Sequence, residues 1–506
     1  MTHNIKKMKI FTSKQIRECD HFTIQREPVS SITLMERAAE ECSNWLANHI
    51  QNHTRFLIFC GNGNNGGDGF AISRLLYQKG FDVEVFIDTD NYVYLDDAKL
   101  NFNQVKDISG IEIKDFDEAH NINFSKNDVI IDAFFGSGLN RNIEGKTSEL
   151  IKLLNKIEAR KISIDIPSGL FADVNINPNS IVFKADHTLS FQFWKQSFLH
   201  PETGIFTGKI HLLNIGLSEE YIQNTPTHQY IICETLIQNI YKPRNEFSHK
   251  GSYGKTCIIG GSFGKIGAAV LATKAALKAG SGLTFTLAPK CGYEVLQSSC
   301  PEAMYLYGGE DFISNFEIEK NMVCGIGPGL GTDPQTEAVF FNFLQLYNQP
   351  VVLDADALNL ISKHPENLNL IPKNSIITPH PKEFERLFGK TENSFERLIL
   401  AQNKAKNLGI FIVLKDHHTQ IITPEGLVYY NITGNSGMAK GGSGDVLTGI
   451  ITSLLSQNYS SQEAAIFGVW LHGKAGDLAS EKHSKEAMLP FDLINELGNV
   501  FKMLKA

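Results

Sequence analysis

The sequence predicts an α/β protein with two domains, each organised around a largely parallel β-sheet. The chain has 506 residues, which is more than one ordinary hydrophobic core accommodates. Short apolar segments alternate with segments of helical periodicity in both halves, an order typical of repeated βα units. A polar stretch at 218–235 separates the halves, with the boundary near 222–228, and we therefore expect domains at 1–225 and 226–506.

Composition and charge restrict the classes of function. Hydrophobic residues make up 42% of the chain and charged residues 20%, as in soluble globular proteins. The net charge of -8 disfavours nucleic acid or an anionic membrane as the main partner, and no apolar run approaches the length of a membrane span. The eight cysteines form no Cys-x-x-Cys pair, and residues 1–12 lack the apolar core of a signal peptide. We expect a cytoplasmic protein that acts on small molecules.

The first half has the element order of a doubly wound α/β domain. Residues 13–50 show helical periodicity, and a fully apolar strand at 55–60 follows. A helix at 70–79 then leads to a strand at 82–87, and this crossover predicts a parallel sheet. Further strands are expected at 128–132, 161–165, 186–193 and 209–215.

Polar residues lie where three of these strands end. The first strand enters an asparagine-rich glycine segment at 61–69, which differs from the usual dinucleotide-binding Gly-x-Gly-x-x-Gly. Ligands of open parallel sheets bind beyond the carboxyl ends of the strands, so four residues should share one crevice: Asn65, Asp132, Asp165 and Ser168. Their oxygen atoms suit a hard cation. The alternative for each aspartate taken singly is a helix cap or a turn.

Three motifs of this half resemble the NAD(P)H-hydrate epimerase family over about residues 10–220. They are Gly63-Asn-Asn-Gly-Gly-Asp-Gly69, Asp132-Ala-Phe-Phe-Gly-Ser-Gly138 and Asp165-Ile-Pro-Ser-Gly169. The resemblance implies a Rossmann-like three-layer domain with a potassium ion (K+) bound by Asn65, Asp132 and Ser168, and with Asp165 as the catalytic proton carrier. It also implies substrate contacts at Asn64, Asn65, Gly66, Gly67, Asp68, Gly136, Ser137, Gly138, Leu139, Asn140, Arg141, Asn142 and Asp165.

The second half repeats the βα pattern and adds a hairpin. Strands are expected at 255–259, 283–287, 322–326, 350–354, 375–378 and 411–415. A helix is expected at 266–279 and another at 463–478, with a hairpin over 419–431 between them.

A glycine-rich stretch at 434–449 carries a single carboxylate, Asp445. The apolar positions that follow it, from Val446 to Leu455, lie on one face of a helix. Glycines before a helix N-terminus favour phosphate binding through backbone N–H groups. A carboxylate there could accept the proton of an attacking hydroxyl during phosphoryl transfer. The alternative is a flexible connector in which Asp445 only caps the helix.

The second half resembles the ADP/ATP-dependent NAD(P)H-hydrate dehydratase family over about residues 228–506. Gly327-Pro-Gly-Leu-Gly331, Thr378-Pro-His-Pro-Lys-Glu383 and the glycine-rich stretch occur in the family order. The resemblance implies a ribokinase-like α/β domain that binds the nicotinamide half of the hydrate at Ala268, Gly329, His380 and Asp445. It implies an adenine nucleotide with Mg²⁺ at Lys415, Asp416, His417, His418, Thr419 and Gly444. Asp416 stands where the family usually has glycine.

Together the two resemblances imply an enzyme that repairs hydrated NADH and NADPH. It would interconvert the R and S hydrates and dehydrate the S form with ADP as phosphoryl donor, as in bacterial fusions, with ATP as the alternative donor. Phosphorylation would solve a chemical problem, because hydroxide is a poor leaving group. A ribokinase-like alcohol kinase with an accessory Rossmann-like domain is the main alternative, and a non-catalytic nucleotide-binding module is a third. We also expect a homo-oligomer.

Overall fold

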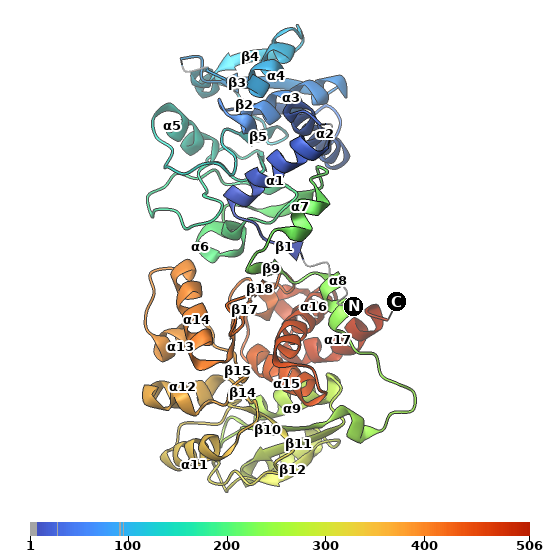
Figure 1. Cartoon of the computed structure of the whole chain (residues 1–506), viewed down its shortest axis with the longest axis vertical. Coiled ribbons are helices and arrows are strands. Elements are labelled where there is room, and N and C mark those ends of the chain that lie inside the picture. The colour runs from blue at the N-terminus through green and yellow to red at the C-terminus, as the bar shows by residue number, and fades with distance from the viewer. Residues whose placement is uncertain (1–7, 28, 91–92, 95, 506) are drawn as a thin grey trace. The chain divides into compact units, whose positions relative to one another are not determined.

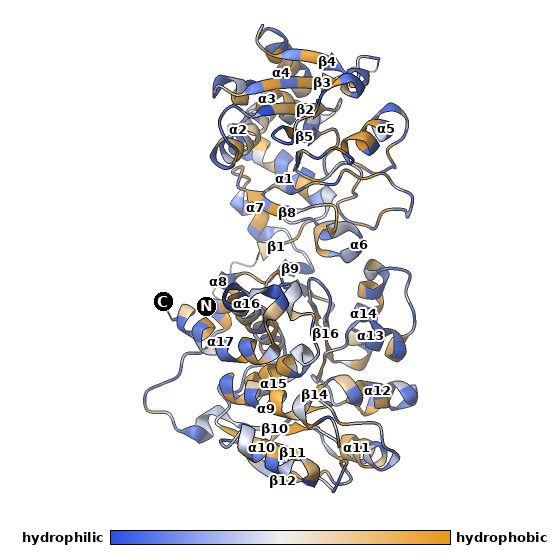
Figure 2. Ribbon diagram, turned by 180° about the vertical axis from the view of Figure 1, so that it is seen from behind, coloured by the Kyte–Doolittle hydropathy of each residue, from blue (hydrophilic) through white to orange (hydrophobic). Residues whose placement is uncertain are grey.

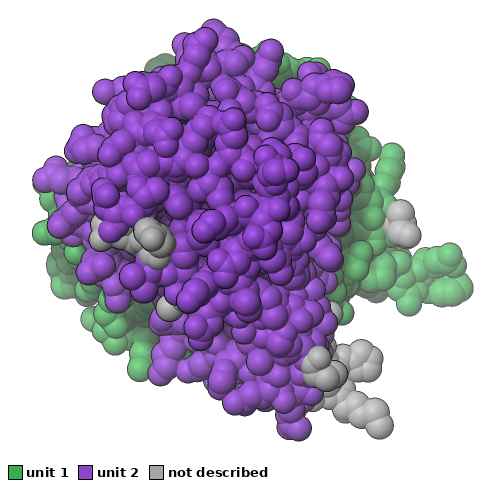
Figure 3. All heavy atoms as spheres, turned by 90° about the horizontal axis from the view of Figure 1, so that it is seen from above, with its two compact units in different colours: residues 1–8, 228–506 green, residues 9–227 purple. Residues whose placement is uncertain are grey.

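The computed structural model describes residues 8–27, 29–90, 93–94 and 96–505 (Figure 1). Residues 1–7, part of the segment in which no signal peptide is expected, lie outside the described residues. Contacts divide the chain into an N-terminal unit of residues 9–227 and a C-terminal unit of residues 228–506 with residues 1–8 (Figure 3). Within the described ranges, every helix is too short or too polar to cross a membrane.

The N-terminal unit is built on a seven-stranded parallel sheet with the order β4-β3-β2-β5-β6-β7-β8. Its strands are β2 (Arg55–Cys60), β3 (Asp82–Ile87), β4 (Glu112–Asp115), β5 (Val129–Ala133), β6 (Arg160–Ile164), β7 (His187–Phe191) and β8 (Lys209–Leu213). The strand order reverses between β2 and β5, and a ligand crevice forms at the carboxyl ends of the strands at such a point.

Helices cover both faces of this sheet. They are α1 (Ser13–Arg26), α2 (Ser31–His49), α3 (Asn64–Gln78), α4 (Asp96–Lys106), α5 (Gly145–Leu154), α6 (Pro201–Gly204) and α7 (Glu219–Asn224). Alternate residues of β2 point to opposite faces: Phe56 and Ile58 belong to the core under α2 and α3, whereas Leu57 and Phe59 belong to the core under α5. The result is the expected three-layer arrangement, with α5 on the far side of the sheet from α2 and α3 (Figure 1).

Helix α3 begins at Asn64, whereas the sequence predicts a glycine-rich turn up to residue 69 and a helix from residue 70. That expectation is wrong because the glycines serve close packing rather than a turn. A Cβ atom on Gly66 would lie 1.8 Å from the carbonyl oxygen of Gly61, and one on Gly69 would lie 2.7 Å from Cys60 Sγ. The first turns of α3 therefore lie directly against the end of β2.

The larger sheet has the order β1-β9-β18-β17-β16-β15-β14-β13-β10-β11-β12, and all its strands after β1 (Met8–Lys9) belong to the C-terminal unit. The strands are β9 (Gln229–Ile231), β10 (Lys255–Ile259), β11 (Leu283–Ala288), β12 (Met304–Tyr307), β13 (Val323–Ile326), β14 (Val352–Leu353), β15 (Ile376–Ile377), β16 (Phe411–Leu414), β17 (Gln420–Ile422) and β18 (Val428–Tyr430). Strands β16, β17 and β18 pair antiparallel, which confirms the predicted hairpin. The other pairs from β9 to β12 are parallel.

Two helical layers enclose this sheet, as Figure 1 shows. One layer contains α11 (Pro334–Leu346), α12 (Ala355–Lys363), α13 (Pro381–Phe388) and α14 (Ser394–Leu408). The other layer contains α9 (Ile266–Lys278), α15 (Ser443–Ser456), α16 (Ser461–Ala487) and α17 (Pro490–Met503). The short helices α8 (Glu234–Ile240) and α10 (Tyr293–Ser299) lie near this second layer. The predicted apolar face of α15 is buried, including Val446, Ile450 and Leu454. Figure 2 shows the apolar residues concentrated on β10, β11 and α15.

Candidate functional site

The glycine-rich stretch enters the N-terminus of α15, as the sequence predicts. Gly442 immediately precedes the helix with φ +99°, a left-handed conformation that glycine adopts without strain. Side chains fix the stretch from both sides, because Asn435 Nδ2 donates to Asp477 Oδ1 at 3.0 Å and Lys440 Nζ donates to the carbonyl oxygen of Met488 at 2.7 Å. A helix N-terminus held in this way is an anion-binding site.

A lysine–carboxylate pair borders this N-terminus. Lys415 Nζ lies 2.8 Å from Asp354 Oδ1, and Thr448 Oγ1 donates to Asp354 Oδ2 at 2.9 Å. A Cβ atom on Gly444 would lie 3.3 Å from Lys415 Nζ and 3.4 Å from Asp354 Oδ2. Lys415 and Gly444 are expected nucleotide contacts, whereas Asp354 is not among the site residues expected from the sequence. The available signal was an acidic residue at the end of a predicted strand, at 350–354.

Asp445 lies in the first turn of α15, beside that pair. Burial, together with the nearby Asp354 carboxylate, raises the pKa of Asp445 to about 7, and the Lys415 ammonium opposes the shift. A carboxylate with a pKa close to neutral pH is suited to accept a proton as a general base. The geometry therefore places a carboxyl group suited to a base next to a helix N-terminus suited to a phosphate.

His380 caps α13 rather than projecting freely from a strand end. Its Nδ1 accepts the backbone N–H groups of Lys382 and Glu383 at 3.1 and 3.3 Å, and Glu383 accepts the backbone N–H of His380 in return at 2.9 Å. Burial lowers the pKa of His380, so the ring is neutral and Nδ1 acts as the acceptor. Glu383 Oε2 also lies 3.9 Å from Lys415 Nζ, which links His380 to the lysine.

Ala268 and Gly329 meet on another side of the same N-terminus. A Cβ atom on Gly329 would lie 3.2 Å from the Ala268 Cβ atom. Ala268 is on α9, and Leu271 one turn later would touch a Cβ atom on Gly442. The face of α9 that carries Ala268 thus reaches the start of α15.

The segment between β16 and β17 contains the nucleotide contacts expected at 416–419. Asp416 Oδ2 lies 3.5 Å from Arg397 Nη1 on α14, so the charge that replaces the family glycine has a cationic partner. His418 Nδ1 lies 3.3 Å from the carbonyl oxygen of Asn431, and burial lowers the pKa of His418 to about 4. Thr419 is tied to the same residue, because its carbonyl oxygen accepts the Asn431 N–H at 2.9 Å.

In the N-terminal unit, Asp132 and Ser168 meet at the switch point of the sheet. Asp132 is fully buried and accepts the Ser168 hydroxyl at 2.5 Å, the Ser168 N–H at 2.8 Å and the Ser163 hydroxyl at 2.8 Å. Burial raises the pKa of Asp132 to about 6, although these hydrogen bonds oppose the shift. Both amide atoms of Asn65 are buried without a hydrogen-bond partner among the described residues. An unsatisfied oxygen near this crevice fits a bound cation.

Asp165 follows β6 in the left-handed region, with φ +64°. Its carboxylate accepts Lys195 Nζ at 2.5 Å and the Ser137 N–H at 3.4 Å. The remaining predicted contacts lie on two neighbouring segments: residues 64–68 form the start of α3, and residues 136–142 follow β5. Lys195 is not among the site residues expected from the sequence, because its partner Asp165 is distant along the chain and Lys195 belongs to no recognised motif.

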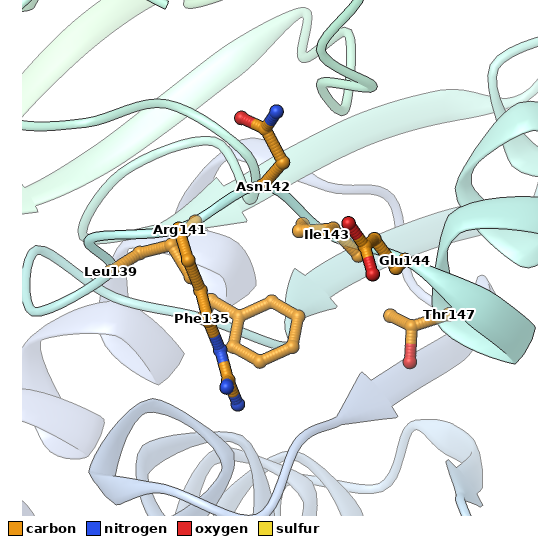
Figure 4. Close-up of a pocket in the computed structure, with 7 residues that line it drawn as sticks. All are labelled: Phe135, Leu139, Arg141, Asn142, Ile143, Glu144 and Thr147. Atoms are coloured by element: carbon orange, nitrogen blue, oxygen red, sulfur yellow. The ribbon is translucent and has the colours of Figure 1, made fainter.

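A cavity of about 460 Å³ opens beside the segment that follows β5 (Figure 4). It is lined by Phe135, Leu139, Arg141, Asn142, Ile143, Glu144 and Thr147, three of which are predicted substrate contacts. The backbone N–H of Phe135 donates to Ser168 Oγ at 2.9 Å, which connects the cavity wall to the Asp132–Ser168 pair.

The two units thus define an enzyme with two separate small-molecule sites, one suited to a cation and one to a phosphate. Residues 31–197 match the model of the YjeF-related protein N-terminus, and residues 256–499 match that of NAD(P)H-hydrate dehydratase. The bifunctional NAD(P)H-hydrate repair enzyme Nnr of Moorella thermoacetica is 32% identical over 98% of this chain and 97% of its own length. The enzyme of the same name from Escherichia coli K12 is 33% identical over 92% of this chain and 89% of its own.

The chain belongs to the family of bifunctional NAD(P)H-hydrate repair enzymes. The expected fold class is confirmed: the N-terminal unit is a Rossmann-like three-layer domain and the C-terminal unit is ribokinase-like. The chain is also similar to the crystallised ADP/ATP-dependent NAD(P)H-hydrate dehydratase of Bacillus subtilis, which was co-crystallised with ATP and Mg²⁺. That protein is 31% identical, with a TM-score of 0.48 over 54% of this chain and 98% of that chain.

Proposed function

We propose that this chain repairs hydrated NADH and NADPH in two steps. The N-terminal unit interconverts the R and S hydrates. The C-terminal unit dehydrates the S hydrate with ADP as phosphoryl donor and releases AMP and phosphate. The observation that carries the second step is Asp445 at the phosphate-binding end of α15, where its pKa is raised to about 7. Membership of the repair family does not favour a simple alcohol kinase.

The dehydration depends on converting a poor leaving group into a good one. Asp445 takes the proton of the ring hydroxyl as the hydroxyl oxygen attacks the terminal phosphorus of the nucleotide. The first-turn N–H groups of α15 and the Lys415 ammonium stabilise the charge on the transferred phosphate. The phosphate then leaves with its bridging oxygen, and loss of a ring proton restores the double bond.

Mg²⁺ is the metal that this half would use. When bound with the nucleotide, it neutralises phosphate charge. The Asp354 carboxylate beside Gly444 would supply the hard oxygen ligand that such an ion needs.

For the N-terminal unit we propose a K+ site at Asn65, Asp132 and Ser168. The unpartnered amide of Asn65 and the buried Asp132 carboxylate support it, since both supply oxygen ligands. Potassium should raise the melting temperature of the whole chain, and Asp132→Asn should abolish that effect. An equal rise in the variant would contradict this site.

A single assay with four arms tests the proposed function. The purified chain is incubated with mixed R and S hydrates and with ADP, ATP, AMP or no nucleotide. We expect full recovery of the absorbance of the reduced ring, with one phosphate released per ring restored, and the fastest recovery with ADP. A stable phosphorylated alcohol without ring recovery would show that the chain is a kinase. Tight binding of hydrate without turnover would identify a binding module.

We further propose that the enzyme is a cytoplasmic homo-oligomer. All eight cysteines lie among the described residues and are free, as expected in a reducing compartment. Light scattering of the purified chain measures the assembly directly, and a mass of one chain, 56.3 kDa, would contradict the oligomer.

A further inference from the structure

Three carboxylates and a buried lysine gather at the crevice of the N-terminal unit. Asp20 comes from α1, Asp68 from the start of α3, Asp165 from the end of β6, and Lys195 from the segment after β7. Lys195 is only 1% exposed, and its Nζ lies 2.5 Å from both Asp165 Oδ1 and Ser190 Oγ. A lysine is rarely buried so completely unless its charge is paired.

The Asp165 carboxylate is held on both oxygens. Oδ1 accepts Lys195 and the Phe191 N–H at 3.3 Å, and Oδ2 accepts the Ser137 N–H at 3.4 Å. The left-handed backbone of this residue, at φ +64°, is a sparsely populated conformation that surrounding contacts must maintain. These contacts fix the direction of the Asp165 carboxylate.

Two other acids near Asp165 have raised pKa values. Burial raises the pKa of Asp68 well above its usual value, and the charges of Asp165 and Asp20 raise it further. Burial and Asp165 also raise the pKa of Asp20 to about 6, while Lys195 opposes that shift. The fourth titratable neighbour is the thiol of Cys42, whose pKa burial raises far enough to keep it neutral. The cluster thus contains a fixed carboxylate and an adjacent carboxylic acid.

We propose that Lys195 is a positioning residue for epimerisation: through its contact with Asp165 it assigns Asp165 as the proton acceptor and leaves Asp68 as the proton donor. This inference rests on the proposed function of the N-terminal unit. Two carboxyl groups with opposed environments are the usual basis of an acid–base pair in one site.

The assignment gives a balanced route between the two hydrates. Water adds to an enamine with its oxygen on the carbon next to nitrogen, so the ring hydroxyl and the ring nitrogen share one carbon. Asp68 donates a proton to the hydroxyl, the C–O bond breaks, and water leaves as the nitrogen lone pair forms a C=N⁺ bond. A water molecule then adds to the opposite face and gives a proton to Asp165. Transfer of that proton back to Asp68 completes the cycle without a net change in the protein.

The pH dependence of epimerisation tests this proposal in the full-length chain. Conversion of pure R hydrate to S hydrate is measured without nucleotide for the wild type, Lys195→Met and Lys195→Arg. Lys195→Met removes the positive charge that contacts Asp165 Oδ1, whereas Lys195→Arg keeps a positive charge at this position. We therefore expect Lys195→Met to move the acid limb of kcat/KM upward by at least one pH unit, and Lys195→Arg to keep it in place. Lys161→Met is the matched control, because the Nζ atom of this β6 lysine donates to the carbonyl oxygens of Ile157 and Ala159 and not to a carboxylate among the described residues.

A second variant keeps the test informative if removal of the lysine charge disturbs folding. Asp68→Asn replaces a neutral acid with a neutral amide of the same shape, so it should leave the melting temperature unchanged and slow epimerisation about 10²-fold or more. A uniform loss at every pH in Lys195→Met, or retained epimerisation in Asp68→Asn, would overturn the proposal. If the wild type itself does not convert R to S hydrate, the proposed function fails, and thermal unfolding of each variant reports whether its N-terminal unit is folded.

Discussion

Asp445 illustrates how position and burial act against each other on one side chain. The first turn of a helix favours a negative charge, which by itself would lower the pKa of a carboxyl group. Burial and the Asp354 charge outweigh the helix and raise the pKa of Asp445 to about 7. The residue is consequently basic enough to take a proton and still ionised in part at neutral pH.

The substitution Asp445→Asn separates catalysis from stability. We expect ADP-dependent recovery of the reduced ring to fall by about 10²–10⁴-fold, because the proton acceptor is lost. Stability at pH 8 should be retained or increase by on the order of 1 kcal/mol, because the variant removes a carboxylate that burial disfavours. Activity assays and thermal unfolding of the same preparation measure both effects. Retention of most activity would remove Asp445 from the mechanism.

The pH profile of dehydration follows from the same group. The pKa of Asp445 is raised, so the basic form disappears as pH falls through about 7. We expect kcat/KM for pure S hydrate to decrease tenfold per pH unit below that point and to level off above it. Lys415 lowers the pKa of Asp445, so Lys415→Met should move the limb to higher pH. A limb near pH 4 would mean that another group limits the rate.

At the scale of elements, the position of α15 is set by glycine packing as much as by its apolar face. A Cβ atom on Gly449 would lie 2.1 Å from the carbonyl oxygen of Ala272 on α9 and 2.9 Å from the Ala275 Cβ atom. Helices that approach so closely leave room only for hydrogen at this position. This contact holds the N-terminus of α15 against the helix that carries Ala268.

We therefore expect Gly449→Ala to lower the free energy of unfolding by about 1–3 kcal/mol through overpacking. Gly498→Ala on α17 is the matched control, since its Cβ atom would meet no heavy atom within 4 Å. The control should stabilise the chain by about 0.5–1 kcal/mol through helix propensity. Urea unfolding of both variants makes the comparison, and equal effects would show that α15 does not depend on this approach.

At the scale of the whole molecule, the two activities belong to two units with their own sheets and cores. The residues proposed for each reaction lie within one unit: Asp165 in the first and Asp445 in the second. The activities should therefore be separable by single substitutions.

Asp165→Asn should slow exchange of the R and S hydrates by about 10²-fold or more and leave the turnover of pure S hydrate unchanged. Asparagine is the suitable replacement, because it tolerates the left-handed backbone at φ +64°, whereas alanine would add strain. Chiral analysis of the hydrates over time gives the first rate, and ring absorbance gives the second. Simultaneous loss of both rates would contradict the division between units.

Local sequence patterns were sufficient to predict the two-domain α/β architecture, the apolar face of α15 and the segments that carry polar residues to the ends of the strands. These features follow from local periodicity and from glycine and polar residues next to predicted strands, which are properties of contiguous sequence. The start of α3 was missed because glycine usually signals a turn, and here it signals close contact with Gly61.

The pairs of oppositely charged side chains could be identified only from the three-dimensional fold. Lys195 is 30 positions from Asp165, and Lys415 is 61 positions from Asp354, yet each pair is within 2.8 Å. Such pairs depend on the order of strands in the sheet and on burial, neither of which local periodicity encodes. For the same reason the shifts in pKa, which come from burial and from neighbours distant in sequence, could not be predicted before the fold was known.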